Sequence, residues 1–201
     1  MKKQLIFASA ALFAVGTVFA QSNMAYTDQS GAGTNSSTVD QVGMSNNSNV
    51  DQIATSASYD PNTSDVNQTG DYNNSTVDQN GAGNNSALTD QTGDWNYSHQ
   101  NSYGANNEVY ATQVGDYNQA SNHQSGSNNM ASSNQTGDAN TSHTDQYFYF
   151  MYSGSNTADY NTATVDQMGN YNGSGIYQQG DYNTADVDQT GDGHSSYISQ
   201  Y

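Results

Sequence analysis

The sequence predicts an all-β fold, a β-solenoid of about eight two-strand rungs with about 22 residues in each rung. Three observations predict it. Gln recurs mostly every 11 or 12 residues, Asn commonly follows it after five residues, and Ser or Ala commonly follows after seven. A random polar tract would not keep this phase over roughly 170 residues. The repeat therefore indicates stacked copies of one unit, and we expect the function to lie in the array and not in a single site.

The segment 180–192 shows the unit most clearly, as a turn, a short alternating strand and the start of the next turn. From Asn183 to Gly191 every second residue is Asn, Ala, Val, Gln and Gly, and the residues between them are Thr or Asp. A strand sends successive side chains to opposite faces. One face of this strand is therefore small and amide-bearing, and the other is polar and acidic.

Residues 1–20 have the features of a secretory signal peptide. Lys2 and Lys3 precede an apolar run from Leu5 to Phe19, and Ala20 provides a small residue at the cleavage point. A transmembrane anchor is the alternative, although the run is shorter than the roughly 20 residues that span a bilayer. We expect cleavage after Ala20, a short N-terminal segment over residues 21–28 and the repeat array over residues 29–201.

The composition excludes several classes of partner and structure. Without residues 1–20 the chain keeps 19 acidic residues and no Lys or Arg. Nothing remains that could neutralise phosphates, which excludes nucleic acid as a partner. The chain has no Cys, so no disulfide framework is possible. Composition alone is typical of disorder, and the phase of the repeat is the argument for order.

The candidate functional residues are the amides that repeat in phase, because stacked Gln and Asn side chains can hydrogen-bond to their copies in neighbouring rungs. The Gln residues of this predicted self-assembly ladder are Gln29, Gln41, Gln52, Gln68, Gln79, Gln91, Gln113, Gln124, Gln135, Gln146, Gln167, Gln178, Gln189 and Gln200. Its Asn residues are Asn46, Asn73, Asn96, Asn118, Asn140, Asn161 and Asn183. Ser102 and Asn156 occupy the two positions where Gln is missing, which makes fifteen units and a closing Gln200.

A second predicted ladder lies on the outside of the solenoid. Every second unit from the fourth to the fourteenth turns through Asp, an aromatic residue (once Ala139) and Asn, so the true period is two units. The Asp residues of this acidic outer ladder, expected to stack one rung apart, are Asp71, Asp94, Asp116, Asp138, Asp159 and Asp181. The aromatic residues beside them, expected to form an external ladder, are Tyr72, Trp95, Tyr117, Tyr160 and Tyr182.

Departures from the repeat length fall in the expected turns. Gly31–Thr34 and Gly81–Asn84 each add one residue, and Ala54–Pro61 adds five, including the only proline. The aromatic segment 146–152 breaks the pattern. It is interpreted either as bulky side chains entering the thin interior or as a bulged rung with an exposed apolar patch.

The pattern Gln-x-Gly-x-x-Asn-x-Ser/Ala-x-x-x-Gln, as written in 180–192, resembles the curlin repeat of curli fibre subunits. The resemblance extends from Gln29 to Tyr201, and the ending Ser199-Gln200-Tyr201 resembles the major subunit more than the nucleator. Two departures are more rungs than is usual and no Gly-rich leader after the signal peptide. The resemblance implies a minor nucleator subunit, a periplasmic chaperone and an outer-membrane secretion pore as partners.

A rung with an interior of Gln, Asn, Ser, Ala and Val cannot be stable alone. Its burial does not offset a backbone entropy of roughly 1–2 kcal/mol per residue. Stacking pairs the backbone groups of all inner rungs, but both ends remain strand edges that can template further strands. The sequence therefore predicts head-to-tail polymerisation. Together with the signal peptide, the resemblance to curli subunits implies a secreted, extracellular functional amyloid fibre at the bacterial cell surface, for adhesion and biofilm matrix.

The acidic outer ladder has an electrostatic consequence. Two unit charges at the rung spacing repel by about 0.9 kcal/mol even in bulk water. Assembly is therefore expected to be slow at low salt and neutral pH, and faster in acid, salt or calcium. The column is interpreted either as a specific calcium site or as a solvated acidic face that maintains solubility.

No catalytic residue, metal site or cofactor is predicted. His99 and His143 lie in one outward column, His123 replaces an Asp and His194 replaces a turn Asn, without a convergent pocket. A disordered acidic surface coat is one alternative to the fibre. The main alternative is a monomeric secreted β-solenoid that binds ice or carbohydrate through the outward column Thr69, Thr92, Val114, Thr136 and Thr157.

Overall fold

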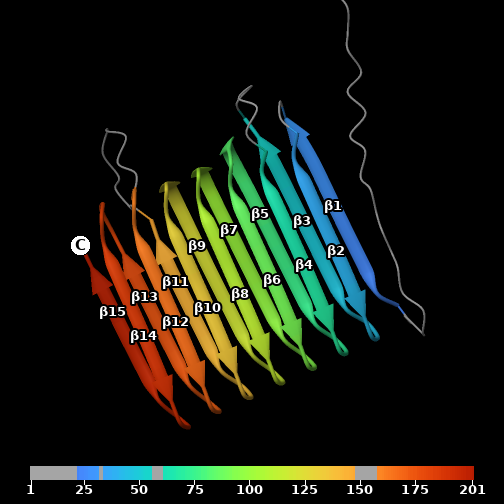
Figure 1. Ribbon diagram of the computed structural model, residues 1–201, viewed down its shortest axis with the longest axis vertical. Coiled ribbons are helices and arrows are strands. Elements are labelled where there is room, and N and C mark those ends of the chain that lie inside the picture. Colours follow the sequence, from blue (N-terminus) through green and yellow to red (C-terminus); the bar gives the residue numbers. More distant parts are fainter. Residues whose placement is uncertain (1–21, 32–33, 56–60, 148–157) are drawn as a thin grey trace, which may run out of the picture.

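The computed structural model describes residues 22–31, 34–55, 61–147 and 158–201. These residues form fifteen β-strands and no helix, and successive strands alternate between two sheets (Figure 1). The odd-numbered strands are β1 (Met24–Gly31), β3 (Asn47–Ala54), β5 (Asn74–Gly83), β7 (Tyr97–Ala105), β9 (Gln119–Ser127), β11 (Thr141–Gln146), β13 (Gly173–Gln178) and β15 (Ser195–Gln200). The even-numbered strands are β2 (Ser36–Val42), β4 (Thr63–Thr69), β6 (Ser86–Thr92), β8 (Glu108–Val114), β10 (Met130–Thr136), β12 (Thr162–Met168) and β14 (Thr184–Thr190).

Both sheets are parallel, and neighbours in a sheet are strands two apart in the chain. The sheet of odd-numbered strands has eight strands, and the sheet of even-numbered strands has seven. Paired residues are most often 22 or 23 positions apart, as in Ser86 opposite Glu108 and Met24 opposite Asn47. The chain therefore winds through seven complete two-strand turns and ends with β15. This confirms the predicted all-β solenoid and its two-strand repeat.

Burial alternates along the strands as the sequence predicts. In β14, the inward residues Ala185, Val187 and Gln189 are buried and the residues between them are exposed. The insertions lie outside or at the ends of strands. The register between β5 and β7 shifts after Asn80, where the turn has one extra residue. Ala54 ends β3, and Pro61 precedes β4.

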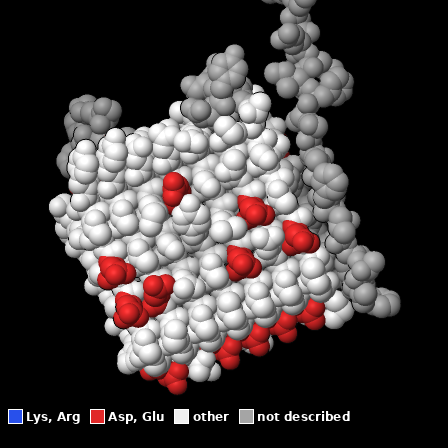
Figure 2. All heavy atoms as spheres, in the orientation of Figure 1, with Lys and Arg blue, Asp and Glu red and all other residues white. Residues whose placement is uncertain are grey.

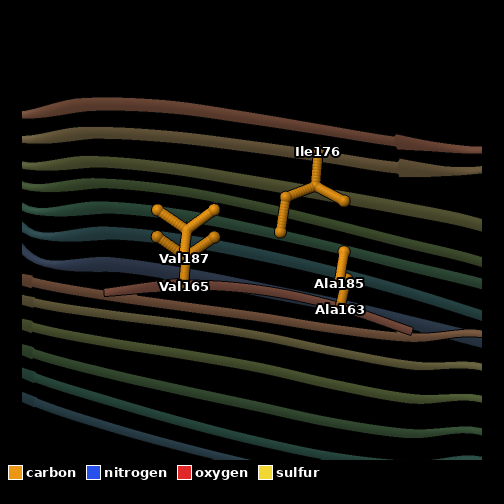
Figure 3. Packing of buried hydrophobic residues seen from close by; sticks show 5 residues of the cluster. All are labelled: Ala163, Val165, Ile176, Ala185 and Val187. Carbon is orange, nitrogen blue, oxygen red and sulfur yellow. The ribbon is translucent and has the colours of Figure 1, made fainter. Parts of the chain in front are cut away.

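The interior is apolar near both ends of the solenoid and polar in the middle. One buried apolar cluster contains Val50, Val66, Val77 and Ala87. The other contains Ala163, Val165, Ile176, Ala185 and Val187. In Figure 3, Val165 lies beside Val187 and Ala163 beside Ala185, while Ile176 points toward them from the facing sheet. Between the clusters the buried interior is mainly polar, with residues that include Thr89, Gln100, Asn122, Ser133 and Thr144.

The structure differs from the sequence prediction in the number of repeat units. Asn156 was expected to begin a unit of its own. However, β11 ends at Gln146, and the next strand, β12, begins at Thr162 and pairs with β10 in the other sheet. The strands on the two sides of residues 147–161 therefore lie in opposite sheets, with no described strand between them. Every strand after Gln146 consequently lies in the sheet opposite to the one predicted.

Several expectations fall wholly or partly outside the described residues. The signal peptide over residues 1–20, Asn156, Thr157 and most of the aromatic segment 146–152 are among them. At the N-terminal side, β1 begins at Met24. Residues 24–28, which the sequence assigned to an N-terminal segment, are thus part of the first strand.

Each end of the solenoid exposes two strand edges. β1 and β2 have a strand neighbour on one side only, and so do β14 and β15 at the opposite end (Figure 1). The inward residues of β1, β2 and β15 remain half-exposed, as for Gln29, Gln41 and Gln200, whereas those of β14 are buried.

Candidate functional site

The sheet of even-numbered strands contains one unbroken Gln ladder. The Nε2 atom of each Gln donates a hydrogen bond of 2.7–2.9 Å to the Oε1 atom of the Gln on the next strand. The members are Gln41, Gln68, Gln91, Gln113, Gln135, Gln167 and Gln189.

The sheet of odd-numbered strands contains a Gln ladder in two parts. Gln29, Gln52 and Gln79 form the first part, with hydrogen bonds of 2.7 Å. The second part, with hydrogen bonds of 2.8 Å, consists of Gln124, Gln146, Gln178 and Gln200. Ser102 occupies the position between them, opposite both Gln79 and Gln124. Its hydroxyl is too short to continue the ladder, and both the Ser102 Oγ and the Gln124 Oε1 are buried without a hydrogen-bond partner.

Each ladder Gln after Gln29 also joins the two sheets. The Nε2 atom of Gln113 donates a second hydrogen bond, of 3.0 Å, to the backbone carbonyl of Tyr97 on the preceding strand. The same contact recurs at both ends of the array, from Gln41 to Met24 and from Gln200 to Thr184. One side chain therefore stabilises both the stacking of rungs and the closing of each rung.

The Asn residues form two columns, one at each turn edge of the solenoid. We call the turns from an even to the following odd strand the even-to-odd edge, and the others the odd-to-even edge. The even-to-odd column is Asn23, Asn46, Asn73, Asn96, Asn118, Asn140 and Asn172. The odd-to-even column is Asn35, Asn62, Asn85, Asn107, Asn129, Asn161 and Asn183.

These Asn columns differ in two ways from the amide ladder expected. Asn161 and Asn183 lie in the column opposite to Asn46, because β12, the strand that follows β11, lies in the even-numbered sheet. In addition, the Asn side chains bond mainly to backbone groups. The Oδ1 atom of Asn96 accepts from the backbone N–H of Asn118 at 3.0 Å, and its Nδ2 donates to the Gly115 carbonyl at 2.7 Å.

Sequence reasoning missed part of the odd-to-even column. Asn84 has the expected spacing from Gln79, but it is exposed, whereas Asn85 is buried and takes the place in the column. The extra residue in this turn was the signal that could have identified Asn85. Asn35 and Asn62 follow the other two insertions and were missed for the same reason.

The predicted acidic outer ladder is divided between the two edges. Asp71, Asp94, Asp116 and Asp138 stack on the even-to-odd edge, where the column continues with Asn170 and Asp192. Asp159 and Asp181 stack on the odd-to-even edge. The expected six-member column is therefore wrong, because β12, the strand that follows β11, lies in the even-numbered sheet and not in the odd-numbered sheet. Figure 2 shows the row of acidic residues along the even-to-odd edge.

The turn carboxylates are also hydrogen-bonded, which the sequence did not show. The Oδ1 atom of Asp116 accepts a hydrogen bond of 2.8 Å from the backbone N–H of Asp94, and Asp138 accepts one of 2.9 Å from Asp116. Each carboxylate thus meets a backbone donor as well as the negative charge of its neighbour. In the same way, the Oδ1 atom of Asn170 accepts a hydrogen bond of 2.8 Å from the backbone N–H of Asp138.

The outward Asp residues that precede Gln form further acidic columns. Asp28, Asp51 and Asp78 lie in register on β1, β3 and β5. Burial, and then the negative charges of Asp78 and Asp28, raise the pKa of Asp51. Burial, followed by Asp90 and Asp40, raises the pKa of Asp65 on the other sheet. Asp166 and Asp188 lie in register on β12 and β14 of the even-numbered sheet.

The aromatic residues stack at the turns, in two groups. The ring centroids of Tyr72 and Trp95 are 4.4 Å apart, and those of Trp95 and Tyr117 are 6.3 Å apart. On the odd-to-even edge, the rings of Tyr160 and Tyr182 are 5.0 Å apart and nearly parallel. All five have positive φ near 60°, a conformation that non-glycine residues seldom adopt. Ring stacking offsets part of that backbone strain.

The His residues show no arrangement typical of catalysis. His99 and His143 lie on either side of Ser121 in one outward column, as predicted. His143 Nε2 is 3.0 Å from Asp145 Oδ2, a hydrogen bond that raises the pKa of His143. Over the part of the chain that the structure describes, no group of three or more His, Asp or Glu side chains could hold a metal ion. In the same residues no helix is long and apolar enough to cross a membrane.

The outward column that suggested ice or carbohydrate binding is mixed in character. Val42, Thr69, Thr92, Val114 and Thr136 are in register on successive even strands. The column continues with Met168 and Thr190. Thr157 lies outside the described residues. The apolar members interrupt the regular array of hydroxyl groups that such a surface needs.

Comparison with known families identifies the repeat. The curlin associated repeat model matches residues 83–115, 104–137, 155–191 and 175–201, which together make up just over half of the chain. No curated protein and no solved structure matches it.

Proposed function

Because the chain belongs to the curlin repeat family, we propose that it is the structural subunit of an extracellular, curli-like amyloid fibre that grows by head-to-tail stacking of solenoids. Family and fold are those of a structural protein and not of an enzyme. The fibre would serve adhesion and the biofilm matrix at the bacterial cell surface. Export would use the signal peptide over residues 1–20, with a minor nucleator subunit, a periplasmic chaperone and an outer-membrane pore as partners.

The observation that carries this proposal is the open state of both ends. The backbone edges of β1 and β2 and of β14 and β15 each have only one strand neighbour. The Gln ladders reach both ends, since the unbroken ladder of the even-numbered strands runs from Gln41 to Gln189 and the two parts of the other ladder end at Gln29 and Gln200. An incoming copy would extend the same backbone pairing and ladders, as edge strands in general template further strands.

A seeded assembly experiment tests the proposal. Residues 21–201 would be incubated with thioflavin T, with and without preformed fibres, and then examined by electron microscopy and fibre diffraction. We expect a lag that seeds abolish and fibres with a repeat of about 4.8 Å along their axis. A chain that folds promptly and stays monomeric would contradict the proposal.

Two matched Gln variants test whether the ladder drives assembly. Gln113→Ala removes a buried side chain and leaves a donor on Gln91 and an acceptor on Gln135 unpaired, at a cost of about 2–4 kcal/mol. Gln119→Ala changes an exposed residue on the adjacent strand and is the control. We expect slow, poorly seeded growth for Gln113→Ala and wild-type growth for Gln119→Ala. Equal growth of the two would remove the ladder from the mechanism.

A further inference from the structure

The number of strands in the described residues is odd, and this limits how one copy can follow another. The first described strand, β1, and the last, β15, lie in the same sheet, so the two sheets have eight and seven strands. At the C-terminal end of the solenoid, no described strand therefore lies on the outer side of β14. A second copy in the same orientation would put its β1 beside β15 and leave that place vacant, with unpaired backbone groups on both sides.

We propose that successive subunits in the fibre are related by a half-turn about the fibre axis, so that β1 of one copy pairs with β14 of the copy before it and β2 pairs with β15. This inference rests on the proposed fibre function and specifies the contact between two copies of the chain. With the half-turn, the next copy fills the vacant place, and every strand edge at the junction is paired.

The half-turn preserves the repeat's register across the junction. If the Gln residues align as they do throughout each sheet, Ala25 meets Ala185 and Gln29 meets Gln189. The internal contact between β12 and β14 already has this form, with Ala163 opposite Ala185. On the other sheet, Val39 meets Ile198, the same apolar position that Ile176 occupies beside Ile198 within the chain.

The direction of the ladder hydrogen bonds makes the two ends complementary. Within the chain, each Nε2 donates toward the C-terminal end and each Oε1 accepts from the N-terminal side. Gln189 and Gln200 therefore present Nε2 donors to an incoming copy, and Gln29 and Gln41 present Oε1 acceptors. Donors meet acceptors only when the C-terminal end of one copy contacts the N-terminal end of the next, with Gln189 bonding Gln29 and Gln200 bonding Gln41.

The absence of Cys in the chain allows a direct test by thiol cross-linking. Three outward-facing positions define the junction: Thr38 on β2, Tyr26 on β1 and Tyr197 on β15. Single variants T38C, Y26C and Y197C would each be checked for growth on wild-type seeds. T38C with Y197C, and Y26C with Y197C, would then be mixed, assembled into fibres and treated with a short thiol cross-linker.

The half-turn places Thr38 beside Tyr197 at the strand spacing of about 4.8 Å and Tyr26 on the opposite sheet, so we expect about tenfold more heterodimer from T38C with Y197C. More heterodimer from Y26C with Y197C, or equal amounts from both mixtures, would overturn the half-turn and leave the fibre in place. Fibres without either cross-link would overturn this junction as well. If no variant or wild-type chain forms fibres, the proposed function itself fails.

Discussion

A single buried Gln makes three hydrogen bonds in this solenoid, and this explains how a thin interior can be stable. Gln113 accepts from Gln91, donates to Gln135 and donates to the Tyr97 carbonyl. An apolar side chain of similar size would bury surface but would make no hydrogen bond to the neighbouring rungs or to the other sheet. A net contribution of about 0.5–1.5 kcal/mol for each hydrogen bond is modest alone and large when repeated in every rung.

Ser102 is the weak point of the odd-strand ladder, and replacing it should stabilise the fold. Ser102→Gln would restore hydrogen bonds to Gln79 and Gln124, whose Oε1 is buried without a partner. We expect a stabilisation of about 1–2 kcal/mol. The guanidinium midpoint for loss of β-structure, followed by circular dichroism, measures it.

The control for this change is Ser132→Gln, since Ser132 points outward on β10. It should leave the midpoint unchanged. A lower midpoint for Ser102→Gln would mean that Gln100, which is buried two residues earlier and donates to the Leu88 carbonyl, already fills the available space.

At the scale of the element, specific contacts join each described even-to-odd turn to the next. In the even-to-odd turns, Gly has φ near 115°, and a Cβ on Gly115 would lie 2.2 Å from the Gly137 carbonyl oxygen. The carboxylate of the next residue, Asp116, accepts a hydrogen bond from the backbone N–H of Asp94. The side chain of Asn118, two residues later, is buried. Close approach of successive turns therefore requires Gly, and the Asp carboxylate then bonds to the backbone of the neighbouring turn.

The turn Asp has two separable effects, on hydrogen bonding and on charge. Asp116→Asn keeps an oxygen that can accept from the Asp94 N–H, as Asn170 does for Asp138, and removes one charge from the column. We expect faster assembly at low salt than for the wild type, because repulsion from Asp94 and Asp138 decreases. The rate of thioflavin T growth at several salt concentrations measures this.

Asp116→Ala is the matched variant, since it removes both the charge and the acceptor. It should assemble more slowly than Asp116→Asn and lower stability by about 1 kcal/mol relative to it. If both variants behaved alike at all salt concentrations, the hydrogen bond to Asp94 would have no role in the turn.

At the scale of the whole molecule, the repeat concentrates negative charge on a surface to which the described residues contribute no Lys or Arg. The described residues carry acidic side chains along the turns and across the sheet faces (Figure 2). Stacking brings these charges to the rung spacing along the whole rod. Acid should therefore stabilise the folded solenoid. The raised pKa values of Asp51 and Asp65 identify two carboxylates whose protonation contributes to this effect.

For these two groups the sign follows from the raised pKa in the folded state. The folded solenoid binds protons more readily than the unfolded chain, so both Asp residues destabilise it above their folded pKa. That penalty decreases as the pH falls through the folded pKa and is absent below the unfolded value of 3.8. The variant Asp51→Asn/Asp65→Asn should thus have a higher guanidinium midpoint than the wild type at pH 7 and the same midpoint near pH 3.

Salt separates the two causes of this shift. Added salt screens the repulsion from Asp28, Asp78, Asp40 and Asp90 but leaves the partial desolvation of the two carboxylates unchanged. Because burial is the larger cause, most of the difference at pH 7 should persist at high salt. If the difference between the midpoints of the variant and the wild type disappeared at high salt, charge repulsion alone would raise these pKa values.

The sequence by itself determined the structure of each unit. The phase of Gln, Asn and Ser or Ala placed the strands, the inward residues and the turns, since strand periodicity and stacking depend only on local spacing. It also indicated the Gln ladder and the interruption at Ser102. Where an insertion shifted the phase by one residue, as at Asn84 and Asn85, the spacing alone pointed to the wrong Asn.

Only the tertiary structure decided in which sheet the strands after Gln146 lie. The length of the segment 147–161 fits either one connection or a short extra unit, and only pairing of β12 with β10 distinguishes them. That choice sets the odd number of strands, divides the Asp and aromatic columns between two edges and leaves the place beside β14 empty. The physical reason is that sequence spacing specifies how a rung repeats, whereas backbone hydrogen bonds between distant segments specify which rung faces which.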